Sequence, residues 1–447
     1  MRIHLLVPLL LALTGTFAPP LAAQGPPASS TAPQIVTSDV TNFWRAYDAV
    51  VASGDSATQV ALIDSLYVAP ETPGLHAMMR ARRYSSAEYR QVILAMPKFW
   101  RSIRSNTLRA GESAAQIARG VEELRLLYPS LRPASVTFTI GAFRSGGTID
   151  GNMVLIGAEI MMADSTTDLS EFPARMAGIR DYMARDPLRK LSFLNVHEFV
   201  HTQQREAPFA LVHRSVYEGV AEFVAVEATR TPSTVPAIAY ERAHRDTVRA
   251  EFMRAIGSAA AVERWLSSDQ RVPFGIRDMG YAIGYAIAEG YSKNSNNHRD
   301  AIRTLIDLEY RDTTALAAVV DASGYLPRPL RTLLREWDAA QPRVERIAPV
   351  ASSVTTMPAS IDAGPTRVQV TFSVPMDTTR RGFDYGPGGE GTVLSVVAVE
   401  GWSSDRRTLT LTVDVKRRDV NELMVTDRFE SADGSPLVPY LVRVQGR

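Results

Sequence analysis

Apolar side chains recur at helical spacing through the first third of the chain, from about residue 40 to residue 127. Val40, Phe43 and Tyr47 lie three or four positions apart, the spacing that places side chains on one face of an α-helix. A second stripe of the same kind begins at Tyr89. The pattern predicts several amphipathic helices whose apolar faces pack into a common core.

The period changes after this helical region. Residues 135–140 alternate between apolar and polar as a β-strand does, a glycine-rich turn follows at 145–148, and residues 152–156 form a second short strand. This second strand suits the edge of a sheet, where an extended peptide can add as a further strand, and equally suits an internal position. Helices are expected at about 171–184 and from Asp186 onward.

The last hundred residues have the pattern of an all-β domain. Residues 341–362 contain three prolines and several serines, which suits a linker or a first edge strand. Short strands separated by turns are typical of a β-sandwich, and four are expected here, at 366–374, 392–400, 408–415 and 423–426.

The N-terminus has the features of a secretory signal. Residues 1–23 contain a basic start, an apolar core and small residues before Gln24. The following residues, 24–38, are rich in Pro, Ser and Ala, and are interpreted as a disordered spacer. We therefore expect an exported protein, periplasmic or extracellular, with no transmembrane segment once the signal is removed.

Length and composition limit the possible functions. With 447 residues the chain is too long for one ordinary domain, and we expect an α+β domain at 39–342, mainly helical with a small β-sheet, before the sandwich at 343–447. A net charge of +1 gives no reason to expect nucleic acid as a partner. The absence of cysteine excludes thiolate ligands, so any metal site must use nitrogen and oxygen donors.

One motif indicates metal chemistry, namely His197-Glu198-Phe199-Val200-His201. Residues four apart leave the same face of a helix one turn apart, so His197 and His201 can chelate one zinc ion. Glu198 lies where it can reach a water activated by the metal without being a ligand itself. Asp186 is expected to cap this helix, and Pro187 suits its first turn.

A second predicted helix, at 211–229, carries two further carboxylates. Here the chain resembles the gluzincin metallopeptidases, in which a glutamate on a following helix completes the H-E-x-x-H site. The resemblance implies that Glu218, in the sequence Glu218-Gly219-Val220-Ala221, is the third metal ligand. Glu222 lies one helical turn further on the same face, where it can accept a hydrogen bond from a ligand imidazole and fix its orientation.

A closer resemblance is to predicted zinc-dependent proteases of bacterial envelopes, including gliding-motility-associated lipoproteins. It is carried by the run Leu155-Ile156-Gly157-Ala158-Glu159 before the H-E-x-x-H helix. The resemblance implies a zinc metallopeptidase-like domain at 39–342. Because this chain lacks the lipidation cysteine of those lipoproteins, their membrane attachment does not carry over.

The C-terminal region is similar to bacterial Ig-like domains. Two segments carry the similarity, Val370–Asp377 with the sequence VTFSVPMD and Trp402–Leu409 with the sequence WSSDRRTL. It implies an Ig-like β-sandwich at 343–447 and leaves the binding partner of this domain open.

Hydrolysis also needs a hydrogen-bond donor that stabilises the negative charge developing on the substrate oxygen. Tyr281 and Tyr285 lie one turn apart on a glycine-bearing helical segment, and periodicity places them equally well. Tyr281 is slightly favoured because it directly follows Gly280. His213 is a weaker candidate. It better suits a surface position, or a position where it contacts a metal ligand without binding the metal.

These features predict a secreted zinc hydrolase that acts on a peptide or protein substrate, with Glu198 as general base. A non-catalytic envelope or adhesion protein with a structural or vestigial metal site is the alternative. An intact Glu198 counts against it, because a structural site has no use for a general base. Hydrolysis of a bond other than a peptide bond also fits the motif.

Overall fold

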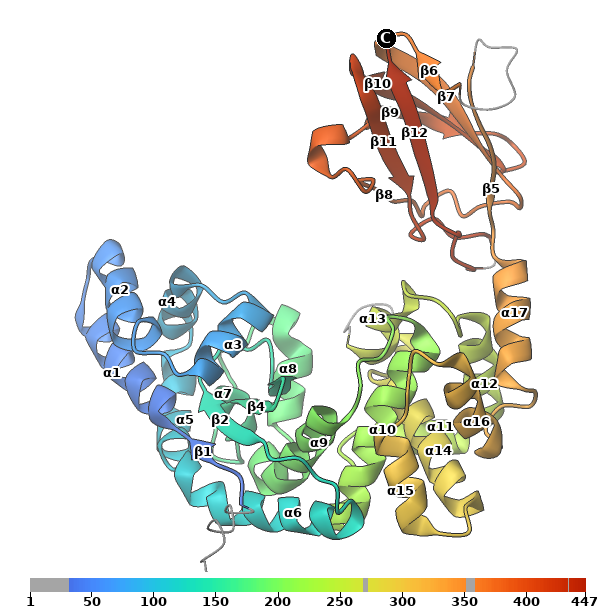
Figure 1. Ribbon diagram of the computed structural model, residues 1–447. Helices are drawn as coiled ribbons and strands as arrows, with labels where there is room; N and C mark the ends of the chain where they lie inside the picture. Colours follow the sequence, from blue (N-terminus) through green and yellow to red (C-terminus); the bar gives the residue numbers. More distant parts are fainter. Residues whose placement is uncertain (1–31, 268–271, 351–357, 433) are drawn as a thin grey trace, which may run out of the picture.

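The computed structural model describes residues 32–267, 272–350, 358–432 and 434–447, and it contains two separate hydrophobic cores (Figure 1). The larger core is built from residues 40–333, and the smaller one from residues 347–444. The predicted signal at 1–23 and the first part of the predicted spacer lie outside the described residues.

The helical pattern at 40–127 is confirmed. Most of this region is α-helix, with a π-helical turn at Asp64–Val68 and a 3₁₀ turn at Ala110–Ser113. Large aromatic side chains such as Phe43 and Trp100 are fully buried in the core, so burial of apolar surface stabilises the bundle. The helices are α1 (Ser38–Ala52), α2 (Ser56–Ile63), α3 (Pro73–Arg82), α4 (Ser86–Ala95), α5 (Pro97–Leu108) and α6 (Ala114–Leu127).

A four-stranded sheet packs against these helices in the order β1-β2-β4-β3. Its strands are β1 (Ile35–Val36), β2 (Ser135–Thr139), β3 (Gly147–Asp150) and β4 (Met153–Gly157). Strands β1, β2 and β4 run parallel, and β3 pairs antiparallel with β4.

Of the two positions left open for the strand predicted at 152–156, the structure has the internal one, as β4. Two expectations for this region were wrong. The segment at 145–148, expected to be only a turn, contains the start of the edge strand β3. The predicted spacer ends earlier than residue 38, because Ile35 and Val36 pair with β2 as β1 and α1 begins at Ser38. In both cases the outcome depends on which strands form backbone hydrogen bonds with each other, and a local sequence pattern does not show this.

Helices build the rest of the first core. The helix predicted at 211–229 is confirmed with the same bounds as α10, whereas the one expected at 171–184 begins as a 3₁₀ turn at Ala174–Met176. No helix among the described residues combines the length and apolarity needed to cross a bilayer. The helices are α7 (Ala158–Met161), α8 (Ala177–Met183), α9 (Leu191–Gln203), α10 (Leu211–Thr229), α11 (Ala237–Ala243), α12 (Arg245–Arg254), α13 (Ala261–Leu266), α14 (Met279–Asn294), α15 (His298–Ile306), α16 (Thr313–Ala322) and α17 (Leu330–Ala340).

Helix α9 carries the H-E-x-x-H motif and lies between the sheet and α10 (Figure 1). It begins after a 3₁₀ turn at Pro187–Lys190. The expected cap is wrong: Asp186 adopts a left-handed conformation, accepts no capping hydrogen bond and instead pairs with Arg189 at 2.7 Å. Burial holds the helix in place, since most of its side chains from Leu191 to Gln203 are buried.

Helices α10 and α14 cross in direct backbone contact because each has a glycine at the crossing. A Cβ added to Gly219 would overlap the backbone of Gly284, and one added to Gly284 would overlap the carbonyl oxygen of Ser215. No other residue type fits at such a crossing. The close approach brings Tyr281, on α14, beside the α9–α10 pair.

Eight strands surround the second core. One sheet has the order β5-β7-β10-β9 and the other the order β6-β12-β11-β8; all pairs are antiparallel except β6 with β12. Three of the four strands expected from the alternating pattern are confirmed within three residues, as β7, β9 and β10, whereas the fourth, expected at 423–426, begins earlier, at Arg418 of β11. The strands are β5 (Val344–Pro349), β6 (Ser360–Ile361), β7 (Gly364–Phe372), β8 (Phe383–Asp384), β9 (Ser395–Trp402), β10 (Thr408–Val415), β11 (Arg418–Val425) and β12 (Tyr440–Gly446).

Candidate metal centre

Three buried donor atoms converge where α9 faces α10. The Nε2 atoms of His197 and His201 are 3.1 Å apart, and Oε2 of Glu218 lies 3.1 Å from Nε2 of His201 and 3.7 Å from Nε2 of His197. All three residues are less than 10% exposed. They form the group in the described part of the chain whose spacing suits a metal ion.

The spacing of the donor atoms fits a tetrahedral zinc site. With metal–ligand distances of about 2.0–2.1 Å, tetrahedral geometry places neighbouring ligand atoms roughly 3.3 Å apart. The three observed separations of 3.1, 3.1 and 3.7 Å lie around this value. Three protein ligands would leave a fourth position for water or substrate.

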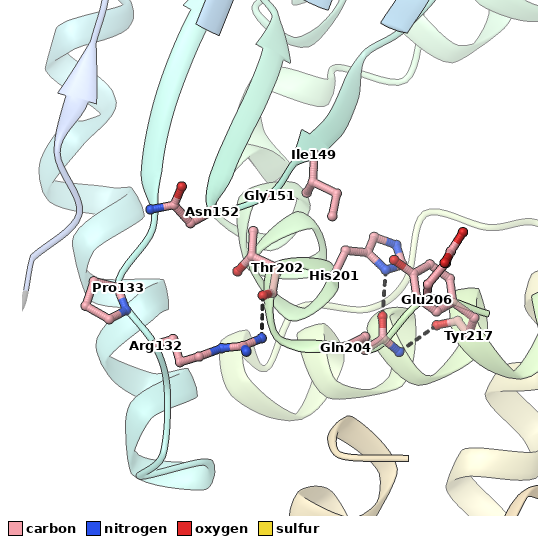
Figure 2. Close-up of a pocket in the computed structure, with 10 residues that line it drawn as sticks. All are labelled: Arg132, Pro133, Ile149, Gly151, Asn152, His201, Thr202, Gln204, Glu206 and Tyr217. Atoms are coloured by element: carbon pink, nitrogen blue, oxygen red, sulfur yellow. Dashed lines mark hydrogen bonds between the residues drawn. The ribbon is translucent and has the colours of Figure 1, made fainter. Parts of the chain in front are cut away.

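A hydrogen-bonded chain behind His201 fixes which of its nitrogens faces the cluster (Figure 2). Nδ1 of His201 lies 2.7 Å from Oε1 of Gln204. Nε2 of Gln204 in turn donates to the carbonyl oxygen of Tyr217 at 3.0 Å and to the hydroxyl of Tyr310 at 2.9 Å. Since the Gln204 amide nitrogen is committed to two acceptors, its oxygen accepts the proton of Nδ1 and leaves Nε2 a lone pair.

His197 is oriented from the other helix. Its Nδ1 lies 2.9 Å from Oε2 of Glu222, the contact proposed for this carboxylate from its position one turn after Glu218. The hydroxyl of Ser233 donates to Oε1 of Glu222. The proton of His197 is therefore drawn to Nδ1, and its Nε2 faces the cluster as that of His201 does.

The third donor, Glu218, is positioned by a neighbour on its own helix. Nη2 of Arg214 donates to its Oε1 at 3.1 Å, which leaves Oε2 directed at the histidines. The Arg214 guanidinium also lies 4.6 Å from the ring centre of Tyr217, and this ring stacks on His201 at 4.5 Å. Arg214 thus positions the Glu218 carboxylate directly and the His201 imidazole through the Tyr217 ring.

The charges of the cluster support cation binding. Burial disfavours the charged form of His197, but the carboxylates of Glu218 and Glu222 outweigh it and raise its pKa to about 10. Burial also opposes ionisation of Glu218, yet the two histidines hold its pKa well below the usual range. Carboxylates in this low-dielectric site attract positive charge, and a metal ion competes with a proton for it.

Glu198 lies beside the cluster and is not part of it. Its carboxylate packs against Gly147 of β3, where an added Cβ would stand 2.6 Å from Oε1 and would force the Glu198 side chain to move. Burial raises the pKa of Glu198. No hydrogen bond to its carboxylate is formed within the described residues, so it is available as a proton acceptor.

The structure separates the two candidate tyrosines. The Tyr281 ring stacks on His197 with centroids 6.1 Å apart, and burial together with the charge of Glu218 raises the pKa of its phenol well above the usual value. Tyr285 instead packs edge-on against Phe223, under the guanidinium of Arg242, and is not brought to the cluster.

His213 is not brought to the cluster either. Its Nδ1 is buried without a hydrogen-bond partner among the described residues. Burial lowers its pKa.

Several residues of the site were not identified from the sequence. Only two of them lie at a helical spacing from a predicted site residue and could have been found in this way. Gln204 follows His201 by three positions, and Arg214 precedes Glu218 by four, both helical spacings. Ser233, Tyr217 and Tyr310 reach the site through tertiary packing, and no spacing rule connects them to the motif.

Two cavities open beside the cluster. The "His201 cavity" has a volume of about 560 Å³ and is shown in Figure 2; its lining includes Arg132, Ile149, Asn152, His201, Glu206 and Tyr217. The "Glu198 cavity", of about 700 Å³, has a lining that includes Gly147, Leu194, His197, Glu198, Ile276 and Tyr281. His201 thus lines one cavity and His197 lines the other.

Comparison with known proteins gives no assignment: no family model, no curated protein and no solved structure matches this chain. The His197, His201 and Glu218 cluster is therefore the feature that carries functional information, a buried site able to hold a metal ion.

Proposed function

We propose that the protein is an exported zinc-dependent metallohydrolase that acts as a peptidase. The observation that carries the proposal is the convergence of two imidazole Nε2 atoms and one carboxylate oxygen, with the opposite nitrogen of each imidazole facing an acceptor. Two lone pairs and a negative charge at about 3 Å from one another repel unless a cation or proton lies between them.

The donor set favours zinc among metal ions. Two imidazoles and one carboxylate, with an open fourth position, are the ligands of catalytic zinc in several hydrolases. Calcium and magnesium prefer sites made entirely of oxygen ligands. When bound, zinc would act as a Lewis acid that activates water and polarises a carbonyl group.

Residues of the chain supply the remaining steps of peptide hydrolysis. Glu198 accepts a proton from the attacking water as the water oxygen bonds to the carbonyl carbon. Tyr281 donates a hydrogen bond to the carbonyl oxygen as it gains negative charge. The C–N bond then breaks, and Glu198 passes the proton to the leaving amine, so that one water is consumed for each bond cleaved.

We also propose that the first core belongs to a gluzincin-type metallopeptidase domain and the second to an Ig-like domain. The H-E-x-x-H helix followed by a helix with Glu218 supports the first of these. The two sheets around the second core support an Ig-like sandwich at 343–447. Because fold alone does not define a function, the sandwich is given no role in the reaction.

Metal analysis tests the metal site. The purified protein should contain about one zinc ion, as expected for a single site with three protein ligands. His197→Ala and His201→Ala should each abolish its retention. Glu218→Gln should weaken zinc binding, and Glu222→Gln should weaken it less, because Glu222 acts through His197. Full zinc occupancy in the His197→Ala/His201→Ala double variant would show that the metal binds elsewhere.

Turnover of a peptide library tests the chemistry. Glu198→Gln should retain zinc and lose most activity, since it removes the proton acceptor and leaves the ligands intact. A zinc-loaded wild-type protein that cleaves no peptide would favour a non-catalytic envelope or adhesion protein with a structural metal site. Cleavage by Glu198→Gln at the wild-type rate would exclude Glu198 as the base.

A further inference from the structure

The lining of the Glu198 cavity contains three arginines, and two of them already lie beside a carboxylate. Arg144 pairs with Glu88, and Nε of Arg277 lies 3.8 Å from the carboxylate of Asp278. The third, Arg185, is exposed and has no acidic partner among the described residues. Its guanidinium therefore keeps its donors available for a ligand that enters the cavity.

The acidic residues of the same lining do not neutralise Arg185. Asp181 lies four positions before it but pairs with Arg180 at 2.9 Å. Oε2 of Glu222 faces Nδ1 of His197 at 2.9 Å. Since these carboxylates already face a cation or an imidazole, the charge of Arg185 remains uncompensated inside the cavity.

Tyr182 lies next to Arg185 at the end of α8 and lines the same cavity. The N–H of Arg185 donates to the carbonyl oxygen of Tyr182 at 3.1 Å, so the helical turn continues past Met183 and keeps the two residues close together. The Tyr182 hydroxyl donates to Sδ of Met161 at 3.5 Å. Because a thioether is a weak acceptor, this hydroxyl can form a stronger hydrogen bond with a ligand.

The electrostatics of Tyr182 place Arg185 near the proposed proton acceptor. Burial raises the pKa of the Tyr182 phenol, the charges of Glu222, Glu198 and Asp278 raise it further, and the charge of Arg185 opposes them. Charges that act on one hydroxyl lie within a short distance of it. The phenol also stays protonated, so it remains a hydrogen-bond donor.

We propose that Tyr182 and Arg185 bind a carboxylate of the substrate close to the bond that is cleaved. This inference rests on the proposed function and names its substrate class, peptides with an acidic group near the scissile bond. A guanidinium and a phenol both donate to carboxylate oxygens, and hydrogen bonds to charged groups are the stronger ones. The carboxylate is that of an Asp or Glu side chain or of the substrate C-terminus.

Matched peptides test the inference with the full-length zinc-loaded protein. A library peptide that is cleaved is remade with Glu or Gln at each position flanking the cut, and with a free or amidated C-terminus. The carboxylate should raise kcat/KM at least about fivefold in one of these comparisons, as expected for a hydrogen bond to a charged group, and that comparison identifies its source. Smaller effects in both would overturn the inference and leave the peptidase proposal standing. Absence of cleavage of every library peptide would overturn both.

Charge reversal tests whether Arg185 is the group responsible. Arg185→Gln should abolish the preference for the carboxylate, and Arg185→Glu should reverse it in favour of a neutral or basic group, with zinc content unchanged. Arg175→Gln is the control, because Arg175 is also exposed and has no acidic partner among the described residues, but does not line the cavity. An unchanged preference in Arg185→Glu, or an equal loss in the Arg175 control, would overturn the assignment.

Two further measurements separate binding from folding and turnover. Tyr182→Phe keeps the ring and removes only the hydroxyl, so it should lower the preference for the carboxylate less than Arg185→Gln does. Calorimetry with the Glu198→Gln variant measures peptide affinity without cleavage and should rank the matched peptides in the same order as kcat/KM. Equal affinity for the carboxylate and amide peptides would contradict the proposed contact.

Discussion

Oε2 of Glu159 accepts a hydrogen bond from the backbone N–H of Gly141 at 2.9 Å, in a position where Glu159 is fully buried. Its Oε1 accepts from the N–H of Phe143, which has a left-handed backbone. The carboxyl group thus holds the loop between β2 and the edge strand β3. Burial nevertheless raises the pKa of Glu159 to about 7, from an ordinary value of 4.5.

This raised pKa predicts that stability falls as pH rises. Below about 4.5 Glu159 is protonated in both states; between 4.5 and 7 the unfolded chain loses the proton first, which favours unfolding. The loss is complete above pH 7 and is on the order of 3 kcal/mol. Urea unfolding of wild type and Glu159→Gln should show a difference in stability that shrinks by this amount from pH 4.5 to 7.5. A constant difference would contradict the prediction.

Gln204 should control metal affinity through His201. Replacing Gln204 with Leu removes the acceptor of the Nδ1 proton and should weaken zinc binding roughly 10- to 100-fold, measured by competition with a chromogenic chelator. Tyr310→Phe keeps that acceptor and removes only the hydroxyl that receives the Gln204 amide, so its effect should be smaller. The reverse order of the two effects would show that Gln204 does not orient His201.

Tyr281 and Tyr285 form a matched pair of variants on one helix. Tyr281→Phe should lower kcat about ten- to a thousand-fold with zinc content and KM little changed, as expected for a lost transition-state donor. Tyr285→Phe should remain within about twofold of wild type, because its ring packs on Phe223. If Tyr281→Phe also keeps full activity, the donor is another residue.

The two hydrophobic cores predict that the C-terminal sheets are dispensable for the site. Few contacts join the parts near the boundary; they include the hydrogen bond from the Val438 N–H to the Pro342 carbonyl oxygen and that from Gln341 to the Pro436 carbonyl. A chain that ends at Pro342 should fold, retain zinc and cleave small peptides, as circular dichroism, metal analysis and a peptide assay can check. A folded truncation without zinc would show that the second domain supports the site.

Close helix crossing makes a further prediction about Gly284. Gly284→Ala should destabilise the protein by several kcal/mol, since the new Cβ overlaps the Ser215 carbonyl oxygen and small-to-large changes in packed interiors cost about 1–3 kcal/mol even without backbone overlap. Gly54→Ala, at an exposed position with no atom near the added Cβ and no positive φ, should cost less. Thermal melts compare the two.

Local patterns were sufficient for much of the architecture. The bounds of α10 follow from apolar periodicity, and the strand β10 follows from strict alternation at Thr408–Val415. The pair His197 and His201 also needs only helix geometry, because residues four apart share a face whatever the surroundings. Such features depend on near neighbours in the chain, and these are visible in the sequence.

The sequence by itself determined the two helices of the site and the donor types they carry, because both depend on helical periodicity. The tertiary structure decided how those helices are rotated against their neighbours. Contact at Gly219 and Gly284 directs Tyr281 toward His197 and leaves Tyr285 against Phe223, although periodicity treats both tyrosines alike. Sheet pairing likewise made β3 the edge. Such choices depend on contacts between residues far apart in the chain, and local spacing does not encode them.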